Sequence, residues 1–246
     1  DEERILACLN RIEAASDHLT SLVDDILDMS KIETDSISIN PVSCLILEQV
    51  SVVFDMFAPQ INEKGLHTSL DINTPSCLVE ADPLNLRRIL EKVIDNAVKF
   101  TQPGGDIRVS VSATVPEEGL IAGKPLVYNF VVKDTGSGMS DDFADHMFDA
   151  FERERNTTAS GMFGIGLGLP ITKGLVEKMG GHIDIETEKG VGTTVSMDIP
   201  FVVCSNVQAS ENGNGQVFQE WSPEGLVGKR VLVVEDNELN RVITEA

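Results

Sequence analysis

The sequence predicts an α+β fold, a two-layer sandwich in which helices cover one face of a mostly antiparallel sheet. Strand-like runs at 107–115 and 126–132 are joined by a hairpin loop rich in Pro, Gly and Glu, and runs at 182–187 and 192–199 follow each other directly. Strands joined by short connections pair antiparallel. The stretch 83–101 instead repeats apolar residues at helical spacing, which predicts a helix packed on that sheet.

A long helix is predicted over residues 1–34, because apolar residues recur about three and four positions apart and neither Pro nor Gly interrupts them. An apolar stripe on a helix must be buried against something. We expect the partner to be an upstream helix, a second copy of the chain, or both; the alternative is that the helix packs on its own domain. The stripe consists of Ile5, Leu9, Ile12, Leu19, Val23 and Ile26, widened by Ala15, Leu22 and Met29.

Shorter elements fill the rest of the chain. Asp82 and Pro83 predict the start of the helix 83–101, because an acidic residue caps the first N–H groups and Pro is tolerated in a first turn. The other predicted elements are strand 36–40, helix 45–64 ending at Gly65, strands 66–72 and 77–80, helix 141–151, a polar loop 152–163, a helix that ends at Met179, a linker 202–228 and a strand 229–237.

The composition excludes some partners. The net charge is −21, with 40 acidic and 19 basic residues, which argues against binding to nucleic acid or to anionic membranes. A polyanionic ligand would therefore need a metal ion and a few well-placed cations. The four cysteines are far apart and indicate free thiols in a reducing compartment. No apolar run approaches the roughly 20 residues that span a bilayer, and there is no signal-peptide pattern or initial Met, which is typical of an excised fragment.

Three local patterns could carry chemistry. The alternating glycines Gly164, Gly166 and Gly168 precede a helix, and bare N–H groups at a helix N-terminus favour phosphate. Asn96 and Lys99 share a helix face, where they could hold Mg²⁺ and a phosphate, although a solvated polar face is the plainer interpretation. Asp134 ends a strand before two glycines and could accept a hydrogen bond from an adenine amine, or it could belong to an ordinary Asp-Thr-Gly turn.

Taken in order, these segments resemble the ATP-binding domain of sensor histidine kinases. Each segment is weak evidence alone, but five in the family's order and spacing are specific, and the resemblance covers about residues 1–201. It implies the two-layer α/β sandwich of the histidine kinase and Hsp90-like ATPase type. The segments are DNAVKFT at 95–101, DTGSG at 134–138, FDAF at 148–151, GIGLGL at 164–169 and GTT at 192–194.

The flanking segments extend the resemblance to a hybrid histidine kinase cut at both ends. Residues 1–35 resemble the second helix of the family's dimerisation hairpin, with the best match over 19–33. The ATP-binding catalytic domain would span 36–201 and the linker 202–228. Residues 229–246 resemble the first strand and helix of a receiver domain, which is too little to fold as a receiver.

The resemblance implies roles for the matching residues in binding ATP and Mg²⁺. Asn96 would hold Mg²⁺ against the phosphates, Lys99 would contact phosphate, and Asp134 would accept from the adenine amine. Phe148 and Phe151 would anchor the loop 152–163, which would act as a lid. The remaining implied nucleotide-binding residues are Gly136 and Gly138, which would shape the pocket; Gly164, Gly166 and Gly168, which would donate N–H groups beside Leu167 and Leu169; and Thr193, near the base.

The sequence departs from the family pattern at several points. The family's phosphoacceptor histidine would lie before residue 1, and His18 lacks the surrounding pattern, so this fragment is not expected to autophosphorylate in the usual way. Lys92 stands where the family usually has another Asn, which would alter the metal geometry or add a phosphate-binding cation. Ala150 replaces a Pro, which would loosen the lid hinge. Glu235 and Asp236 match the acid pair of a receiver whose phosphoacceptor aspartate would lie beyond residue 246.

The implied function is transfer of the γ-phosphoryl group of ATP to a histidine, for relay to a receiver aspartate in cis or on a separate response regulator. The implied partners also include a second copy of the chain through helix 1–34, and the implied location is the cytoplasm, with any membrane anchor in regions not present. Two alternatives stay open: a non-catalytic nucleotide-binding scaffold, suggested by Lys92, and another ATPase of the same fold, against which the long helix and receiver-like tail argue.

Overall fold

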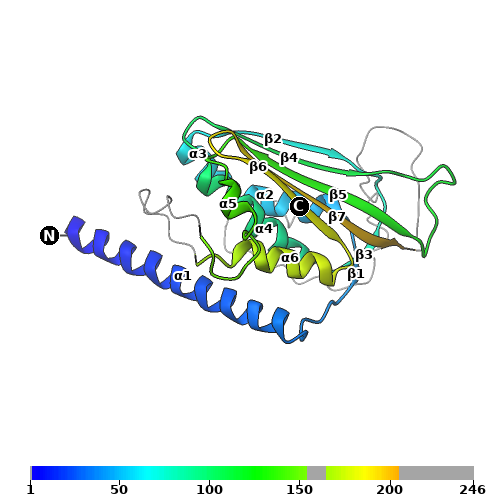
Figure 1. The fold of residues 1–246 in the computed structure, drawn as a ribbon, viewed down its shortest axis with the longest axis horizontal. Helices are drawn as coiled ribbons and strands as arrows, with labels where there is room; N and C mark the ends of the chain where they lie inside the picture. Colours follow the sequence, from blue (N-terminus) through cyan, green and yellow to red (C-terminus); the bar gives the residue numbers. More distant parts are fainter. Residues whose placement is uncertain (1, 154–164, 205–246) are drawn as a thin grey trace, which may run out of the picture. The chain divides into compact units, whose positions relative to one another are not determined.

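The computed structural model describes residues 2–153 and 165–204, all within one compact unit, 1–209. A seven-stranded sheet carries helices α2 (Ile46–Met56), α4 (Pro83–Phe100) and α6 (Gly168–Lys178) on one face (Figure 1). The core lies between these two layers, where the inward residues of the strands meet the apolar faces of the helices. The predicted α+β two-layer sandwich is therefore confirmed.

The sheet is antiparallel except at one edge, where β2 pairs with β4 in parallel. The long strand β7 pairs with β5 along one side, while β6 and then β3 pair with successive parts of its other side. The strand order is β1-β3-β7-β5-β4-β2. The strands are β1 (Val42–Cys44), β2 (His67–Asn73), β3 (Val79–Ala81), β4 (Asp106–Ala113), β5 (Pro125–Asp134), β6 (His182–Glu188) and β7 (Gly192–Val203).

Helix α4 is the central helix of the layer, since it packs against both α2 and α6. Its predicted cap is confirmed: the Asp82 carboxylate accepts from the N–H groups of Leu84 at 3.1 Å and Asn85 at 3.0 Å. Its predicted inward face is also confirmed by the buried side chains of Leu86, Ile89, Leu90, Val93, Ile94 and Ala97. This packing fixes the rotation of α4 and directs another face of the helix toward the start of α6.

Helix α1 (Glu2–Glu33) runs beside α6, and its C-terminal part packs on the domain (Figure 1). Met29 and Ile32 pack against the core, and Ile32 lies against Gly174 of α6. Packing on its own domain, the alternative interpretation, is thus correct for this end of the helix. Five residues of the predicted stripe are exposed in this chain, namely Leu9, Ile12, Leu19, Val23 and Ile26, so the predicted dimer stays a prediction.

Two predicted elements differ near the start of the domain. The strand predicted at 36–40 is wrong, because the Asn40 N–H donates to the Asp82 carboxylate at 2.9 Å instead of pairing with a neighbouring strand. The helix predicted at 45–64 is two helices, α2 and α3 (Ala58–Lys64), which meet at Phe57. Pro59 explains the break, since it lacks an N–H and its ring would clash with a carbonyl four residues earlier in a continuous helix.

The helix predicted at 141–151 is also too long. Helix α5 covers only Asp141–Ala144, and single turns follow it, in which the His146 N–H donates to the Phe143 carbonyl at 2.9 Å. Tighter turns of this kind do not continue an α-helix. Residues 145–153, the described part of the chain after α5, therefore form turns and a loop.

Several predictions fall outside the described residues. These are most of the proposed lid with Gly164, nearly all of the linker, and the receiver-like stretch with Glu235 and Asp236. Across 2–153 and 165–204, no helix is both long and apolar enough to cross a bilayer. All four cysteines are free thiols, as predicted.

Candidate functional site

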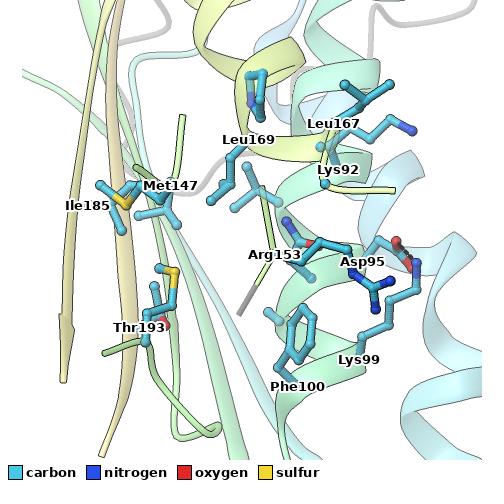
Figure 2. Close-up of a pocket in the computed structure, with 18 of the residues that line it drawn as sticks. Lys92, Asp95, Lys99, Phe100, Met147, Arg153, Leu167, Leu169, Ile185 and Thr193 are labelled. Atoms are coloured by element: carbon cyan, nitrogen blue, oxygen red, sulfur yellow. Dashed lines mark hydrogen bonds and ion pairs between the residues drawn. The ribbon is translucent and has the colours of Figure 1, made fainter. Parts of the chain in front are cut away.

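A cavity of about 230 Å³ lies between α4, the start of α6 and the sheet. In Figure 2, Asp95 and Lys99 stand on the α4 side, Ile185 and Thr193 on the strands opposite, and Leu167 and Leu169 at the start of α6. The predicted site residues that line the cavity are Asn96, Lys99, Asp134, Gly138, Gly166, Leu167, Gly168, Leu169 and Thr193. Segments distant in sequence thus converge on one space.

Asp134 lines the cavity and is the last residue of β5. The residue is only 9% exposed, and its Oδ1 accepts the Gly136 N–H at 2.8 Å. Burial raises the pKa of this carboxyl, while hydrogen bonds from the backbone N–H groups of Gly136 and Thr193 act in the opposite direction. A carboxylate has about four lone-pair positions, so it can still accept a hydrogen bond from a ligand amine.

The glycines after Asp134 permit a close approach of the backbone. Gly136 does not line the cavity; a Cβ there would lie 2.7 Å from Asp134 Oδ1 and 2.8 Å from the Phe100 carbonyl oxygen. Gly138 does line it, with a φ of 57°, and a Cβ there would lie 2.0 Å from the Glu188 carbonyl oxygen. Side chains at these positions would push the turn away from α4 and from the end of β6.

The start of α6 forms another part of the wall, and Asn96 faces it. The Asn96 side-chain amide nitrogen lies 3.6 Å from where a Cβ on Gly168 would be, and its oxygen 4.0 Å. The first N–H groups of a helix have no partner within the helix and carry partial positive charge. Asn96 and the N–H groups of Gly168 and Leu169 therefore offer a site for an anion and for a cation bound to it.

Gly166, just before α6, packs against the backbone of Phe151 and Glu152. Its φ is 75°, its carbonyl accepts the Phe151 N–H at 3.1 Å, and a Cβ would lie 2.3 Å from the Glu152 carbonyl oxygen. Any larger residue would have to displace one of the two backbones. The contact therefore places the two ends of the proposed lid side by side.

Two lysines of α4 line the cavity, and each pairs with a carboxylate. The Lys99 amine bonds to Asp95 one turn earlier on the same helix (Figure 2). The Lys92 amine bonds instead to Asp25 of α1. Arg153 adds a third basic side chain to the lining.

The two phenylalanines at the ends of the segment 148–151 differ in their surroundings. Phe148 packs against the core, and the Lys173 amine lies 4.8 Å from its ring centre. Phe151 is 62% exposed, has a φ of 69° and is not among the residues that line the cavity. Its predicted place in the nucleotide site is not reproduced by this arrangement, whereas Phe148 could anchor the loop as predicted.

Sequence reasoning missed the contribution of α1 to the cavity and part of its apolar wall. Ser21, Leu22 and Asp25 line one side, and Met139, Phe143 and Met147 line another. Leu22 and Met29 belong to the predicted stripe, and their helical spacing with Asp25 is the signal that could have placed Asp25 on the same side of α1.

The donor set near Asn96 fits Mg²⁺. Among the described residues, no three His, Cys, Asp or Glu side chains gather as a metal site. Mg²⁺ in kinases and ATPases needs few protein ligands, because substrate phosphates and waters complete its octahedron. The amide oxygen of Asn96, beside the start of α6, is a suitable ligand of this kind.

The comparisons with known proteins agree on one family. Residues 81–203 match the family described as histidine kinase-, DNA gyrase B-, and HSP90-like ATPase. The autoinducer 2 sensor kinase/phosphatase LuxQ of Vibrio cholerae is 32% identical over 95% of this chain and 26% of its own length. The sensor histidine kinase GacS of Pseudomonas protegens is 30% identical over 97% of this chain and 24% of its own. The chain thus spans about a quarter of these relatives.

Solved structures lead to the same conclusion. Full-length ShkA, crystallised in complex with AMPPNP, is 30% identical, with a TM-score of 0.63 over 78% of this chain and 37% of its own. The histidine kinase AdeS of Acinetobacter baumannii, 21% identical with a TM-score of 0.59 over 81% of this chain and 84% of its own, supports the fold alone. The chain belongs to the histidine kinase-, DNA gyrase B- and HSP90-like ATPase family and carries the ATP-binding catalytic domain of a sensor histidine kinase.

Proposed function

We propose that this domain binds Mg-ATP and supplies the γ-phosphoryl group to a histidine of the full-length kinase, for relay to a receiver aspartate. The observation that carries the proposal is the cavity itself. It has a buried carboxylate, Asp134, in one part of its wall and the start of α6 with Asn96 in another. In a nucleotide such as ATP, the amine of the purine needs an acceptor such as a carboxylate. Its phosphates need backbone N–H groups and a metal ligand, as at the start of α6 and Asn96.

The adenine amine would donate to Asp134, and the apolar side chains of Met139, Met147 and Ile185 would cover the base. Guanine has a carbonyl oxygen at the same ring position. It would therefore place an acceptor against a carboxylate, which is unfavourable. We infer a preference for ATP over GTP, with Gly138 and Thr193 shaping the same part of the pocket.

The phosphates would lie at the start of α6. The N–H groups of Gly168 and Leu169 would donate to them, and Asn96 would hold Mg²⁺, which neutralises charge on the phosphate oxygens. Lys99 would contact phosphate after leaving Asp95. In the transfer, the bond from the bridging oxygen to the γ-phosphorus breaks as an imidazole nitrogen bonds to that phosphorus, and ADP leaves. The protein contributes mainly position and charge.

Calorimetric titration with ATP and GTP tests the proposal. Asp134→Asn removes the charge and exchanges one of the two acceptor oxygens for an NH₂ donor, so ATP affinity is expected to fall about 10- to 100-fold, since hydrogen bonds to charged groups contribute about 1.5–3 kcal/mol. Asp141→Asn is the matched control, because this aspartate is exposed and outside the cavity lining. Wild-type ATP affinity in Asp134→Asn, or no preference for ATP over GTP, would contradict the assignment.

The kinase activity needs a separate test. The full-length protein incubated with labelled ATP is expected to acquire phosphate that is acid-labile and base-stable, as phosphohistidine is. ATP binding without such a product would favour the alternative of a non-catalytic scaffold. Multiple turnover of ATP without any phosphohistidine would favour another ATPase of this fold.

The remaining partners are also proposals. The exposed apolar face of α1, with Leu19, Val23 and Ile26, is suited to a helix of a second copy of the chain. A receiver domain in cis or a separate response regulator would take the phosphoryl group. The reaction would take place in the cytoplasm, where ATP is available.

A further inference from the structure

An ion pair between two helices forms part of the cavity wall. The Lys92 amine of α4 bonds to the Asp25 carboxylate of α1, and the two side chains are only 25% and 14% exposed. Both residues line the cavity, and Ser21 and Leu22 of α1 line it beside them. One wall of the proposed nucleotide site is therefore a part of α1, which lies outside the sandwich.

Lys92 stands within reach of the proposed phosphate site. Lys92, Asn96 and Lys99 follow one another at four and three residues, so they share a face of α4. Asn96 faces the start of α6, and Lys92 lies four residues before it, about 6 Å along the helix axis. A lysine amine on its flexible four-carbon stem can cover that distance.

The charges around the cavity would allow the Lys92 amine to exchange its carboxylate partner for a phosphate. Lys92 is held by Asp25 and Lys99 by Asp95, in a chain whose net charge is −21. A triphosphate that enters the cavity competes with both carboxylates for these amines. When Lys92 moves to the phosphate, Asp25 is left as a half-buried carboxylate without that amine, which favours its exposure to water.

We propose, on the basis of the nucleotide site proposed above, that Lys92 is a phosphate-binding residue whose resting partner is Asp25. Binding of the triphosphate and the contact of Asp25 with α4 exclude each other. Since coupling between two binding events is reciprocal, holding α1 against Lys92 weakens ATP binding, and ATP releases this part of α1. Lys92 thus connects the nucleotide to the long helix.

The neighbouring contacts of α1 involve no residue of the cavity lining and do not compete with the phosphate. Asp28, one turn further along, accepts from Arg88 at 3.4 Å and from Lys31 at 3.5 Å, outside the cavity lining. Ile32 packs on Gly174, and Asp35 pairs with Lys178. These contacts keep the C-terminal end of α1 attached while the part around Asp25 moves.

The test compares ATP and adenosine affinities by calorimetry in four variants of the full chain. Asp25→Asn removes the competing charge, so ATP is expected to bind about fivefold more tightly or better. Lys92→Gln is expected to bind ATP about tenfold more weakly. In the double variant the gain from Asp25→Asn disappears, because no amine is left to release. Asp28→Asn is the matched control and leaves the ATP affinity unchanged.

Adenosine carries no phosphate, so it distinguishes a phosphate contact from a change in the binding of the base or sugar. Its affinity is expected to be the same with and without Asp25→Asn. Hydrogen exchange then reports on α1: saturating ATP should increase exchange around residues 21–25 and leave 29–33 unchanged. The inference is overturned if Asp25→Asn binds ATP as the wild type does, if Asp28→Asn gives the same gain, or if the gain persists with Lys92→Gln. Absence of ATP binding in the wild type would instead refute the nucleotide site itself.

Discussion

Gly166→Ala is the substitution whose effect follows most directly from the geometry of the site. The φ of 75° already costs an alanine about 1–2 kcal/mol, because its Cβ crowds the following carbonyl in the left-handed region. The Cβ would also lie 2.3 Å from the Glu152 carbonyl oxygen, whereas ordinary contact begins at 3.4 Å. One of the two backbones must therefore shift by about 1 Å, and a displacement of this size in a site that depends on positioning can weaken function about 100-fold.

Gly119→Ala is a matched control for the strain alone. Its φ is 81°, and no atom lies within 4 Å of the added Cβ. Both variants carry the strain of the left-handed φ, and Gly166→Ala is expected to lose more stability in thermal denaturation, because it also carries the clash with Glu152. Only Gly166→Ala is expected to lose ATP affinity in calorimetry, by at least about tenfold. The reasoning is refuted if Gly166→Ala binds ATP as tightly as Gly119→Ala does, since the contact with Glu152 would then have no bearing on the site.

Two other predictions concern charge and assembly. The adenine amine needs an ionised Asp134, and burial raises the pKa of this carboxyl, so ATP affinity should fall as the pH falls, beginning at a higher pH than for an ordinary aspartate. Titrations of the wild type and of Asp134→Asn over the same pH range check this, and parallel profiles would contradict it. The exposed face of α1 should make the chain a dimer by light scattering, and Leu19→Glu with Ile26→Glu should make it a monomer. A wild-type monomer at micromolar concentration would count against the dimer.

Part of the site was predictable because its signals are local. The acidic cap and Pro83 mark the start of α4, and the helical spacing fixes which side of that helix is buried, so the facing of Asn96 follows from the sequence. Asp134 at a strand end and the glycines after it could be recognised in the same way. The strand at 36–40 failed because the partner of the Asn40 N–H, a carboxylate 42 residues away, leaves no local sign.

Other features depend on which surfaces meet in the folded chain. The fold class, the buried face of α4 and the local form of the nucleotide segments could be predicted from the residues alone, because these follow from backbone hydrogen bonding and from the periods of helix and strand. The tertiary structure decided that one face of α1 packs on the domain, and that Lys92 pairs with Asp25, which is 67 residues away in the sequence. Each of these residues is compatible with water or with many partners, and only the packing of α1 on the domain brings the two charges together.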